Sequence, residues 1–429
     1  MRRFHVRNFG CRSSQADGAA IEALLGEHGL ESSSDPKSAE FVILNTCTVT
    51  ATADSEVRQV IRRVNRENPD AQIVVTGCYA QRAPDELINL PGVSMVVGNS
   101  HKAMMAELLT APFHGEIHVG DIFGSSEFFS LPVDGAKGDR SRPNLKIQDG
   151  CPNRCSFCII PAVRGGSRSA PVDQIISQVR GLSSTYPEVV LTGINLGRWG
   201  RDNRMGMRLP DLLRLLMNET DVRRIRLSSV EPMDWSDDLL TLMADSPRIA
   251  KHMHAPLQSG SDTVLRRMHR KYRPHHYESR VRLARDLMPD AAIGADVMTG
   301  FPGESEDEFE QTRAFIEKLP LTYLHIFPYS ERPGTPAFEA TNQVPQSERK
   351  ERGRVLKTVG DAKNLDFRSR MTGRMLSAVT LGNGEAMSSN YIPISLATPR
   401  PARQIVDLRI GAIAAVGVRE LAEFHVLAN

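Results

Sequence analysis

Short apolar runs alternate with helix-like segments along most of this 429-residue chain. Within residues 1–115 the strand-like runs are 4–9, 41–45, 73–76 and 93–97. Strands that alternate with helices predict βαβ units, whose strands lie parallel in one sheet. We therefore expect an α/β protein that begins with a domain built on a doubly wound parallel sheet.

A second series of the same kind occupies residues 144–345. Its six strand-like runs, which amphipathic segments separate, are 145–148, 189–192, 225–228, 252–256, 292–299 and 323–328. Six consecutive βα units predict a partial or full parallel barrel. In such barrels the chemistry takes place at the C-terminal ends of the strands.

Three further segments carry weaker patterns. Residues 116–143 contain Gly, Ser and Asp without periodicity, which predicts a linker. Residues 346–370 predict a basic helical connection, because charged residues recur there at helical spacing. Residues 371–429 return to β-type alternation with turn signals, including Gly-Asn-Gly at 382–384, and predict a small C-terminal β-barrel.

The overall composition excludes several classes of protein. The chain has 53 basic and 51 acidic residues, which excludes a globally basic nucleic-acid coat but not a local basic patch. Six cysteines are too few for a disulfide-dense secreted scaffold. The N-terminus lacks the apolar stretch of a signal peptide, and the apolar run 410–418 is too short for a membrane span. We expect a cytoplasmic protein whose thiols act as metal ligands or catalysts.

Half of the cysteines form the motif Cys151-Pro-Asn-Arg-Cys155-Ser-Phe-Cys158, directly after the first strand of the second series. A structural zinc site usually has four ligands, and no further Cys or His lies nearby to complete one. Thiolates at this density are typical of iron–sulfur clusters. Three ligands would leave one iron of a four-iron cluster open to a reactant. An incomplete zinc site and a chance triplet of core cysteines are the less favoured alternatives.

The other three cysteines occupy matching places in the first series. Cys11, Cys47 and Cys78 each come shortly after a predicted strand. The carboxyl ends of parallel strands share one edge of a sheet, and α/β proteins bind ligands at that edge. We therefore expect the three thiols to lie together, and separate buried thiols are the alternative.

The motif from Cys151 to Cys158, placed in a βα series, resembles that of the radical S-adenosylmethionine (SAM) enzymes. In that superfamily the open iron binds the amino and carboxylate groups of SAM, and an electron from the cluster cleaves the C–S bond of SAM. The resulting deoxyadenosyl radical abstracts hydrogen from an unactivated carbon. Segments 191–195, 228–232 and 296–303 are similar to further motifs of the superfamily. The resemblance implies that SAM contacts Thr192, Gly193, Asn195, Ser229, Glu231 and Asp296.

The surroundings of the first three cysteines resemble the N-terminal domain of the methylthiotransferases. The matching segments are 10–11, 45–50 and 76–81, and downstream 254–262, 300–304 and 327–330. The resemblance extends over residues 4–340 and implies a second 4Fe–4S cluster, held by Cys11, Cys47 and Cys78. The implied reaction inserts sulfur at an unactivated C–H bond and uses a second SAM as the methyl donor. The open iron of the N-terminal cluster would hold the sulfur.

Three branches of this family differ in substrate. Two modify an adenosine beside the tRNA anticodon that carries an isopentenyl or a threonylcarbamoyl group, and the third modifies an aspartate of a ribosomal protein. Segments 45–50, 58–63, 77–81 and 191–197 are most similar to the threonylcarbamoyl branch, whereas Ser14 and Pro152 stand where Asn is usual or common. We expect a methylthiotransferase that acts on C2 of N6-threonylcarbamoyladenosine. A non-enzymatic iron–sulfur RNA-binding protein is the alternative from another class.

The resemblance also implies partners. These are the tRNA anticodon stem-loop and an electron donor of the reduced flavodoxin or ferredoxin type; a membrane is not expected. Basic residues at 266–285 could contact phosphates or form a solvated helix face. Residues 371–429 would be an RNA-binding module, although they lack obvious aromatic side chains for base stacking apart from Tyr391 and Phe424. His254 either lines the site or is structural, whereas His275 and His276 are expected on the surface.

Overall fold

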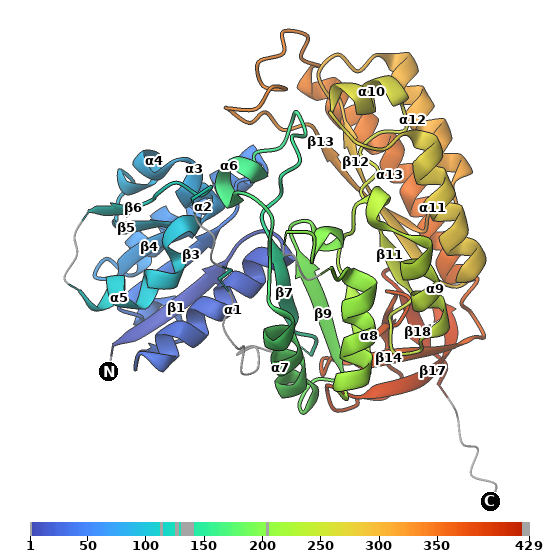
Figure 1. The fold of residues 1–429 in the computed structure, drawn as a ribbon, viewed down its shortest axis with the longest axis horizontal. Coiled ribbons are helices and arrows are strands. Elements are labelled where there is room, and N and C mark those ends of the chain that lie inside the picture. The colour runs from blue at the N-terminus through green and yellow to red at the C-terminus, as the bar shows by residue number, and fades with distance from the viewer. Residues whose placement is uncertain (1, 112–114, 125–127, 130–140, 203–205, 423–429) are drawn as a thin grey trace, which may run out of the picture.

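The computed structural model describes residues 2–111, 115–124, 128–129, 141–202 and 206–422. These residues form three units that follow one another along the chain (Figure 1). The first unit is a parallel sheet with the strand order β2-β1-β3-β4-β5-β6. Its strands are β1 (Arg3–Asn8), β2 (Glu31–Ser32), β3 (Phe41–Thr46), β4 (Gln72–Gly77), β5 (Val93–Gly98) and β6 (Glu116–His118). The predicted doubly wound parallel sheet is confirmed.

Alternate residues of the central strands pack against helices on opposite faces of this sheet. Phe41 and Ile43 of β3 belong to one apolar cluster, together with residues of α1 and α5. Val42 and Leu44 belong to a second cluster, on the side of α2 and α4. The helices are α1 (Arg12–Glu27), α2 (Ala51–Glu67), α3 (Cys78–Arg82), α4 (Pro84–Ile88) and α5 (Met105–Thr110). Helices therefore cover both faces of this sheet.

The second unit is a partial barrel of six parallel strands in chain order. One sheet has the order β10-β9-β7-β8 and the other β11-β12-β13, and a parallel bridge between Ile225 and Ile249 joins them. The six parallel strands are β7 (Asn144–Asp149), β9 (Glu188–Gly193), β10 (Arg224–Leu227), β11 (His252–His254), β12 (Ala292–Thr299) and β13 (Tyr323–Pro328), and the two-residue β8 (Arg168–Ser169) pairs antiparallel with β7. The helices are α6 (Ile160–Arg164), α7 (Val172–Ser183), α8 (Leu209–Glu219), α9 (Asp237–Asp245), α10 (Asp262–Arg267), α11 (Pro274–Leu287), α12 (Glu306–Lys318) and α13 (Gln346–Ser369). The predicted partial barrel is confirmed.

Alternation along the barrel strands separates an apolar outer face from a polar inner face. Leu145 and Ile147 of β7 pack into the main apolar cluster, whereas Lys146 and Gln148 between them are buried polar residues. Successive side chains of a strand point to opposite faces. Helix α1 of the first unit packs beside β7 (Figure 1). Lys146 is paired with Asp17 of α1 and so faces the N-terminal domain, whereas Gln148 bonds to groups of the barrel itself.

The third unit is a small closed β-barrel, as predicted. Its strands are β14 (Met375–Thr380), β15 (Glu385–Ser388), β16 (Pro393–Ser395), β17 (Ile405–Ile413) and β18 (Val418–Glu420). Arg226 of β10 joins it to the partial barrel, because its guanidinium donates to the carbonyls of Ser388 and Ser389 at 2.9 and 3.1 Å. The same guanidinium is paired with the buried Glu188 at 2.7 Å.

The structure differs from the expectations in one place. Residues 116–118 were expected in a linker, but they form β6, which pairs with β5; a three-residue strand is too short for a visible alternation. Tyr391, one of the two tyrosine or phenylalanine side chains of the C-terminal segment that could stack on a base, has its ring stacked on His252 with 4.3 Å between centroids; the other, Phe424, lies outside the described residues. None of the described helices combines the length and apolar character that crossing a membrane requires.

Candidate metal and cofactor site

The first three cysteines meet at the carboxyl edge of the N-terminal sheet. Cys11 and Cys47 lie in the loops after β1 and β3, and Cys78 begins α3 directly after β4. These strands are neighbours in the sheet. Gly10 has a φ of +89°, and a Cβ atom there would lie 2.5 Å from Cβ of Cys47. The loops therefore touch, and the structure brings together the thiols that the sequence predicted to lie at one edge.

The three thiols influence one another. Burial raises the pKa of Cys47 to about 12, and the adjacent Cys78 and Cys11 contribute in the same direction. Cys47 and Cys78 are buried, whereas Cys11 is exposed. A metal must displace the proton from such a thiol. The site is thus closed on the side of the sheet and open at Cys11.

The second set of cysteines lies in one loop after β7. The amide of Cys151 donates to the carbonyl of Gly165 at 3.0 Å, and the amide of Cys158 donates to the carbonyl of Cys155 at 3.1 Å. Burial raises the pKa of Cys158 to about 12, and Cys155 and Cys151 add to the shift. These contacts fold the loop so that the charges of its three thiols affect one another.

Both sets fit four-iron clusters by their donor chemistry. Thiolates are the usual protein ligands of such clusters. The chain has six cysteines, and each set uses three of them. A cluster on either set would therefore keep one iron without a cysteine ligand, which is the iron that a reactant needs.

Two of the residues predicted to contact SAM are linked to the second set. Asn195, which follows β9, donates from Nδ2 to Sγ of Cys151 at 3.4 Å. Glu231, which follows β10, is paired with Arg270. Arg270 in turn donates from Nη1 to Sγ of Cys155 at 3.2 Å.

The other predicted SAM contacts lie at strand ends around the barrel. Thr192 and Gly193 end β9, and Ser229 is exposed after β10. A Cβ on Gly193 would lie 2.9 Å from Cβ of Gln148 on the neighbouring strand, so a small residue is needed there. Asp296 lies on β12 and faces residues of β11 and β13 rather than the cysteines.

Asp296 belongs to a polar group on the inner face of the barrel. Its carboxylate lies 3.0 Å from Nε2 of His254 and 3.2 Å from Nδ1 of His325. Burial disfavours the charge, yet these two hydrogen bonds hold the pKa of Asp296 below its usual value. His254 also contacts the hydroxyl of Tyr323 through Nδ1 at 2.8 Å. His254 is therefore buried in this group, while His275 and His276 are exposed, as predicted.

The sequence did not single out His325, although alternation along β13 places it on the same face as Tyr323. Ligand atoms of His254, Asp296 and His325 lie within 4.8 Å of one another, a separation that a divalent ion could bridge. Both ring nitrogens of His254 already have partners. The group is therefore complete as a hydrogen-bonded set.

The sequence also did not reveal the arginine donors to sulfur. Arg164, the last residue of α6, donates from Nε to Sγ of Cys78 at 3.2 Å. Asn99 adds a longer contact from Nδ2 to the same sulfur at 3.7 Å. Each cysteine set thus has one arginine on one of its sulfur atoms, Arg164 on the first and Arg270 on the second.

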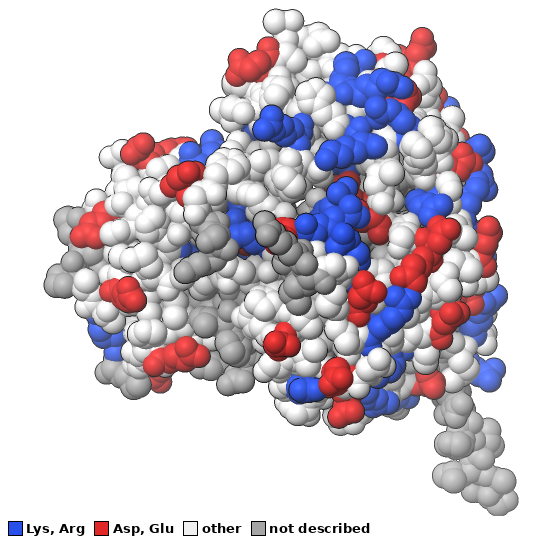
Figure 2. Space-filling model, viewed as in Figure 1, with Lys and Arg blue, Asp and Glu red and all other residues white. Residues whose placement is uncertain are grey.

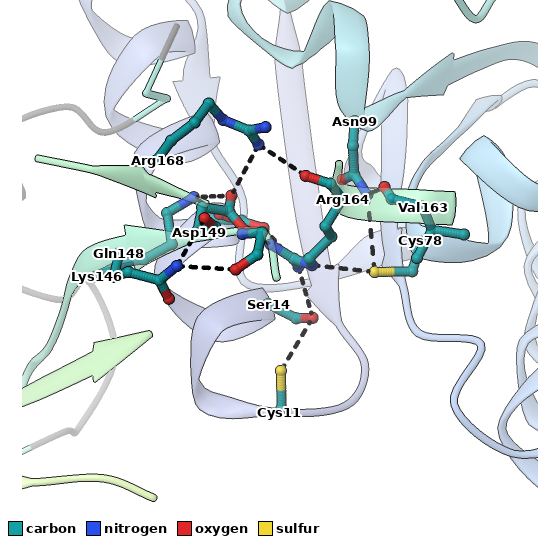
Figure 3. A network of polar contacts seen from close by, with 12 residues as sticks. Cys11, Ser14, Cys78, Asn99, Lys146, Gln148, Asp149, Val163, Arg164 and Arg168 are labelled. Atoms are coloured by element: carbon teal, nitrogen blue, oxygen red, sulfur yellow. Dashed lines mark hydrogen bonds and ion pairs between the residues drawn. The ribbon is translucent and has the colours of Figure 1, made fainter. Parts of the chain in front are cut away.

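A buried ion network reaches Cys78 through Arg164 (Figure 3). Its members are Asp17 of α1, Lys102, Lys146 and Asp149 of β7, and Arg164. Asp17 is paired with Lys102 at 2.8 Å and Arg164 at 2.9 Å, and also with Lys146. Burial opposes the charge of Asp17, but the three cations hold its pKa well below the usual value. The network therefore joins the N-terminal domain to the barrel by charge.

Two family models match this chain. Residues 3–98 match the model described as Uncharacterized protein family UPF0004, and residues 145–316 match that of the Radical SAM superfamily. Among solved structures, the chain resembles the radical S-adenosylmethionine methyltransferase TsrM from Kitasatospora setae, with a TM-score of 0.58. That match covers 79% of this chain and 77% of the other at 16% identity. It therefore establishes a shared fold.

Curated relatives match over most of their length. Threonylcarbamoyladenosine tRNA methylthiotransferase MtaB of Bacillus subtilis is 39% identical over 88% of this chain and 84% of its own. The protein of the same name from Aquifex aeolicus is 38% identical over 90% and 94%. The tRNA-2-methylthio-N(6)-dimethylallyladenosine synthase of Thermobifida fusca is 32% identical over 100% and 89%. From the identity and coverage of the first two relatives, the chain belongs to the radical-SAM methylthiotransferase family, in the branch of the threonylcarbamoyladenosine tRNA methylthiotransferases.

Proposed function

We propose that this chain adds a methylthio group to C2 of N6-threonylcarbamoyladenosine next to the tRNA anticodon. Membership of the family makes the chain an enzyme that uses SAM and 4Fe–4S clusters on a tRNA substrate. The observation that carries the proposal is the pair of three-cysteine sets, one at the edge of each parallel unit, joined by one ion network. One set can serve the radical step and the other the delivery of sulfur.

Each set of residues has a proposed role. The cluster ligands are Cys151, Cys155 and Cys158 for the radical cluster, and Cys11, Cys47 and Cys78 for the second cluster. The SAM contacts are Thr192, Gly193, Asn195, Ser229, Glu231 and Asp296. When bound, the radical cluster and SAM would supply the radical, and the second cluster would hold the sulfur, whose donor is a further partner. The chain itself holds these groups, and the donors Asn195 and Arg270 orient the radical-cluster loop through its sulfur atoms.

The three units divide the work in this proposal. Residues 1–118 carry the second cluster, 144–345 carry SAM and the radical cluster, and 371–429 bind RNA, with 119–143 and 346–370 as connections. The radical cluster needs one electron, and a reduced flavodoxin or ferredoxin is the proposed donor. A tRNA substrate also supports a cytoplasmic location.

The arginine run at 266–285 is a weak candidate for the RNA contact, because it carries its own counter-ions. Figure 2 shows Lys and Arg side chains over α10 and α11 with Asp and Glu between them. The ion pairs are Arg266–Asp262, Arg267–Glu308, Arg273–Asp262, Arg280–Asp237 and Arg282–Glu278. A phosphate would have to displace these carboxylates.

A cleft between the three units is a better candidate, although two of its arginines also have counter-ions. It has a volume of about 790 Å³, and its described lining contains four arginines and no acidic side chain. The arginines are Arg12, Arg142, Arg400 and Arg403. Arg142 is paired with Glu188 and Arg400 with Glu420. The other two, Arg12 and Arg403, have no ion pair among the described residues. Arginine binds phosphate oxygens through paired N–H groups. We propose that the cleft holds the phosphate backbone of the tRNA, which supports an RNA-binding role for the C-terminal barrel.

The double substitution Arg400→Gln and Arg403→Gln should weaken binding of an anticodon stem-loop RNA. Loss of two phosphate contacts should reduce the slope of log K against log salt by about 1.4. Filter binding over a range of salt concentrations measures this slope. The control Arg354→Gln with Lys357→Gln removes two exposed charges on α13 and should leave the slope unchanged. Equal effects of both pairs would contradict the assignment of the cleft.

Mass spectrometry of tRNA nucleosides tests the proposed substrate. Cells without this gene should lose the methylthio mark on threonylcarbamoyladenosine and keep the mark on isopentenyladenosine. Loss of the second mark instead would show that the chain belongs with the other tRNA branch. Unchanged tRNA together with a lost mark on a ribosomal-protein aspartate would favour the third branch. Cluster binding without SAM cleavage would favour a non-enzymatic RNA-binding protein.

A further inference from the structure

Arg164 contacts both halves of the site. It is buried at the end of α6, shortly after Cys158 in the chain. Its Nε atom donates to Sγ of Cys78, which belongs to the other domain, at 3.2 Å. We propose that Arg164 is a positioning residue that raises the reduction potential of the cluster on Cys11, Cys47 and Cys78. This inference rests on the proposed function, because it assumes that these thiols hold a cluster.

The guanidinium of Arg164 is held in one orientation (Figure 3). Nη1 donates to Asp149 at 2.9 Å, and Nη2 donates to Asp17 at 2.9 Å. A longer contact joins Nη2 to Oγ of Ser14 at 3.4 Å. With both Nη atoms occupied by carboxylates, Nε is left facing the sulfur of Cys78. The ion pairs therefore fix the direction of the N–H···S hydrogen bond.

The same contacts connect the cysteine loops of the two domains. Asp149 comes shortly before Cys151, so Arg164 spans the base of the radical-cluster loop. Ser14 lies within 3.7 Å of Sγ of Cys11 through Oγ. Cys78 also packs against Ile159 and Val163 of the α6 region. Arg164 thereby holds the site formed by Cys11, Cys47 and Cys78 against the loop that carries Cys151, Cys155 and Cys158.

The charge of Arg164 and its hydrogen bond act in the same direction on the cluster. Reduction adds one electron and makes the cluster and its thiolates more negative. Hydrogen bonds to sulfur and nearby positive charge stabilise the reduced form and raise the potential. In the buried network the cations Lys102, Lys146 and Arg164 outnumber the carboxylates Asp17 and Asp149. A net positive charge therefore faces Cys11, Cys47 and Cys78.

The test is a potentiometric titration of the cluster on Cys11, Cys47 and Cys78 alone. The full chain with Cys151, Cys155 and Cys158 replaced by Ala is reconstituted anaerobically and titrated with dithionite in the presence of mediators, and the reduced cluster is followed by EPR. In this background Arg164→Gln should lower the midpoint potential. At the parental midpoint the ratio of reduced to oxidised cluster should fall at least about tenfold, which for one electron is about 59 mV.

Two variants separate the hydrogen bond from the charge. Arg164→Lys keeps the charge but loses the planar donor, so it should shift the potential less than Arg164→Gln. Arg168→Gln removes a neighbouring cation that donates to the carbonyl of residue 164 at 3.0 Å and not to sulfur. It should also have a smaller effect than Arg164→Gln.

A parental potential in Arg164→Gln, with about four irons bound, would overturn the inference. If Arg164→Gln does not take up a cluster, a parental potential in Arg164→Lys would overturn it equally. An equal shift in Arg168→Gln would refute the role of the hydrogen bond. Failure of the triple-alanine background to bind any iron would instead count against the second cluster and hence against the proposed function.

Discussion

Replacement of Cys151, Cys155 and Cys158 by Ala is expected to abolish methylthio transfer and halve the bound iron. The reconstituted parent should carry about eight irons and this variant about four, because each set holds one four-iron cluster. Without the radical cluster, SAM cleavage should also be lost. Iron analysis and detection of 5′-deoxyadenosine measure the two effects.

The reciprocal triple substitution distinguishes the two sets. Replacing Cys11, Cys47 and Cys78 by Ala should also leave about four irons, but SAM cleavage should persist while sulfur insertion is lost. The matched control is Ser156→Ala, which changes a loop side chain that donates to the carbonyl of Arg267 and offers no thiol. It should keep about eight irons. A parent that carries only about four irons would contradict the two-cluster site if replacement of Cys11, Cys47 and Cys78 leaves that number unchanged.

Substitution Asp17→Asn is expected to destabilise the protein by about 3–5 kcal/mol, since removing one partner of a buried ion pair leaves its partners uncompensated. Asp17 is 1% exposed and is paired with Lys102, Lys146 and Arg164. An amide keeps the shape of the side chain but removes the negative charge that these cations share. Denaturant unfolding of the apo chain measures the loss.

The control for this prediction is Asp286→Asn on the exposed face of α11, which should change the free energy of unfolding by no more than about 0.5 kcal/mol. Both substitutions remove one negative charge from the chain, so a general effect of net charge would appear in both. An unfolding midpoint of Asp17→Asn equal to that of the parent would show that the network does not stabilise the docked domains.

The order of the elements and the cysteine sets could be predicted because their signals are local. The run 41–45 is apolar at every position except its last, and Cys47 follows shortly after it, so the strand and its polar end were visible together. Parallel pairing then placed Cys11, Cys47 and Cys78 at one edge without further information. By contrast, β6 has three residues and gave no periodic signal. The pairing of the basic run with acids from α9 and α12 also depends on neighbours distant in sequence.

The sequence by itself determined the family, the two sets of three thiols and the succession of sheet, partial barrel and small β-barrel. These features depend on residue type and short spacing. The tertiary structure decided which charged groups meet between the domains. Arg164 and Cys78 are 86 positions apart and come into contact because α6 packs against α3. Burial then makes each unpaired charge costly, so the docking of the domains, rather than any local pattern, selects the partners of Asp17 and the donor to Cys78.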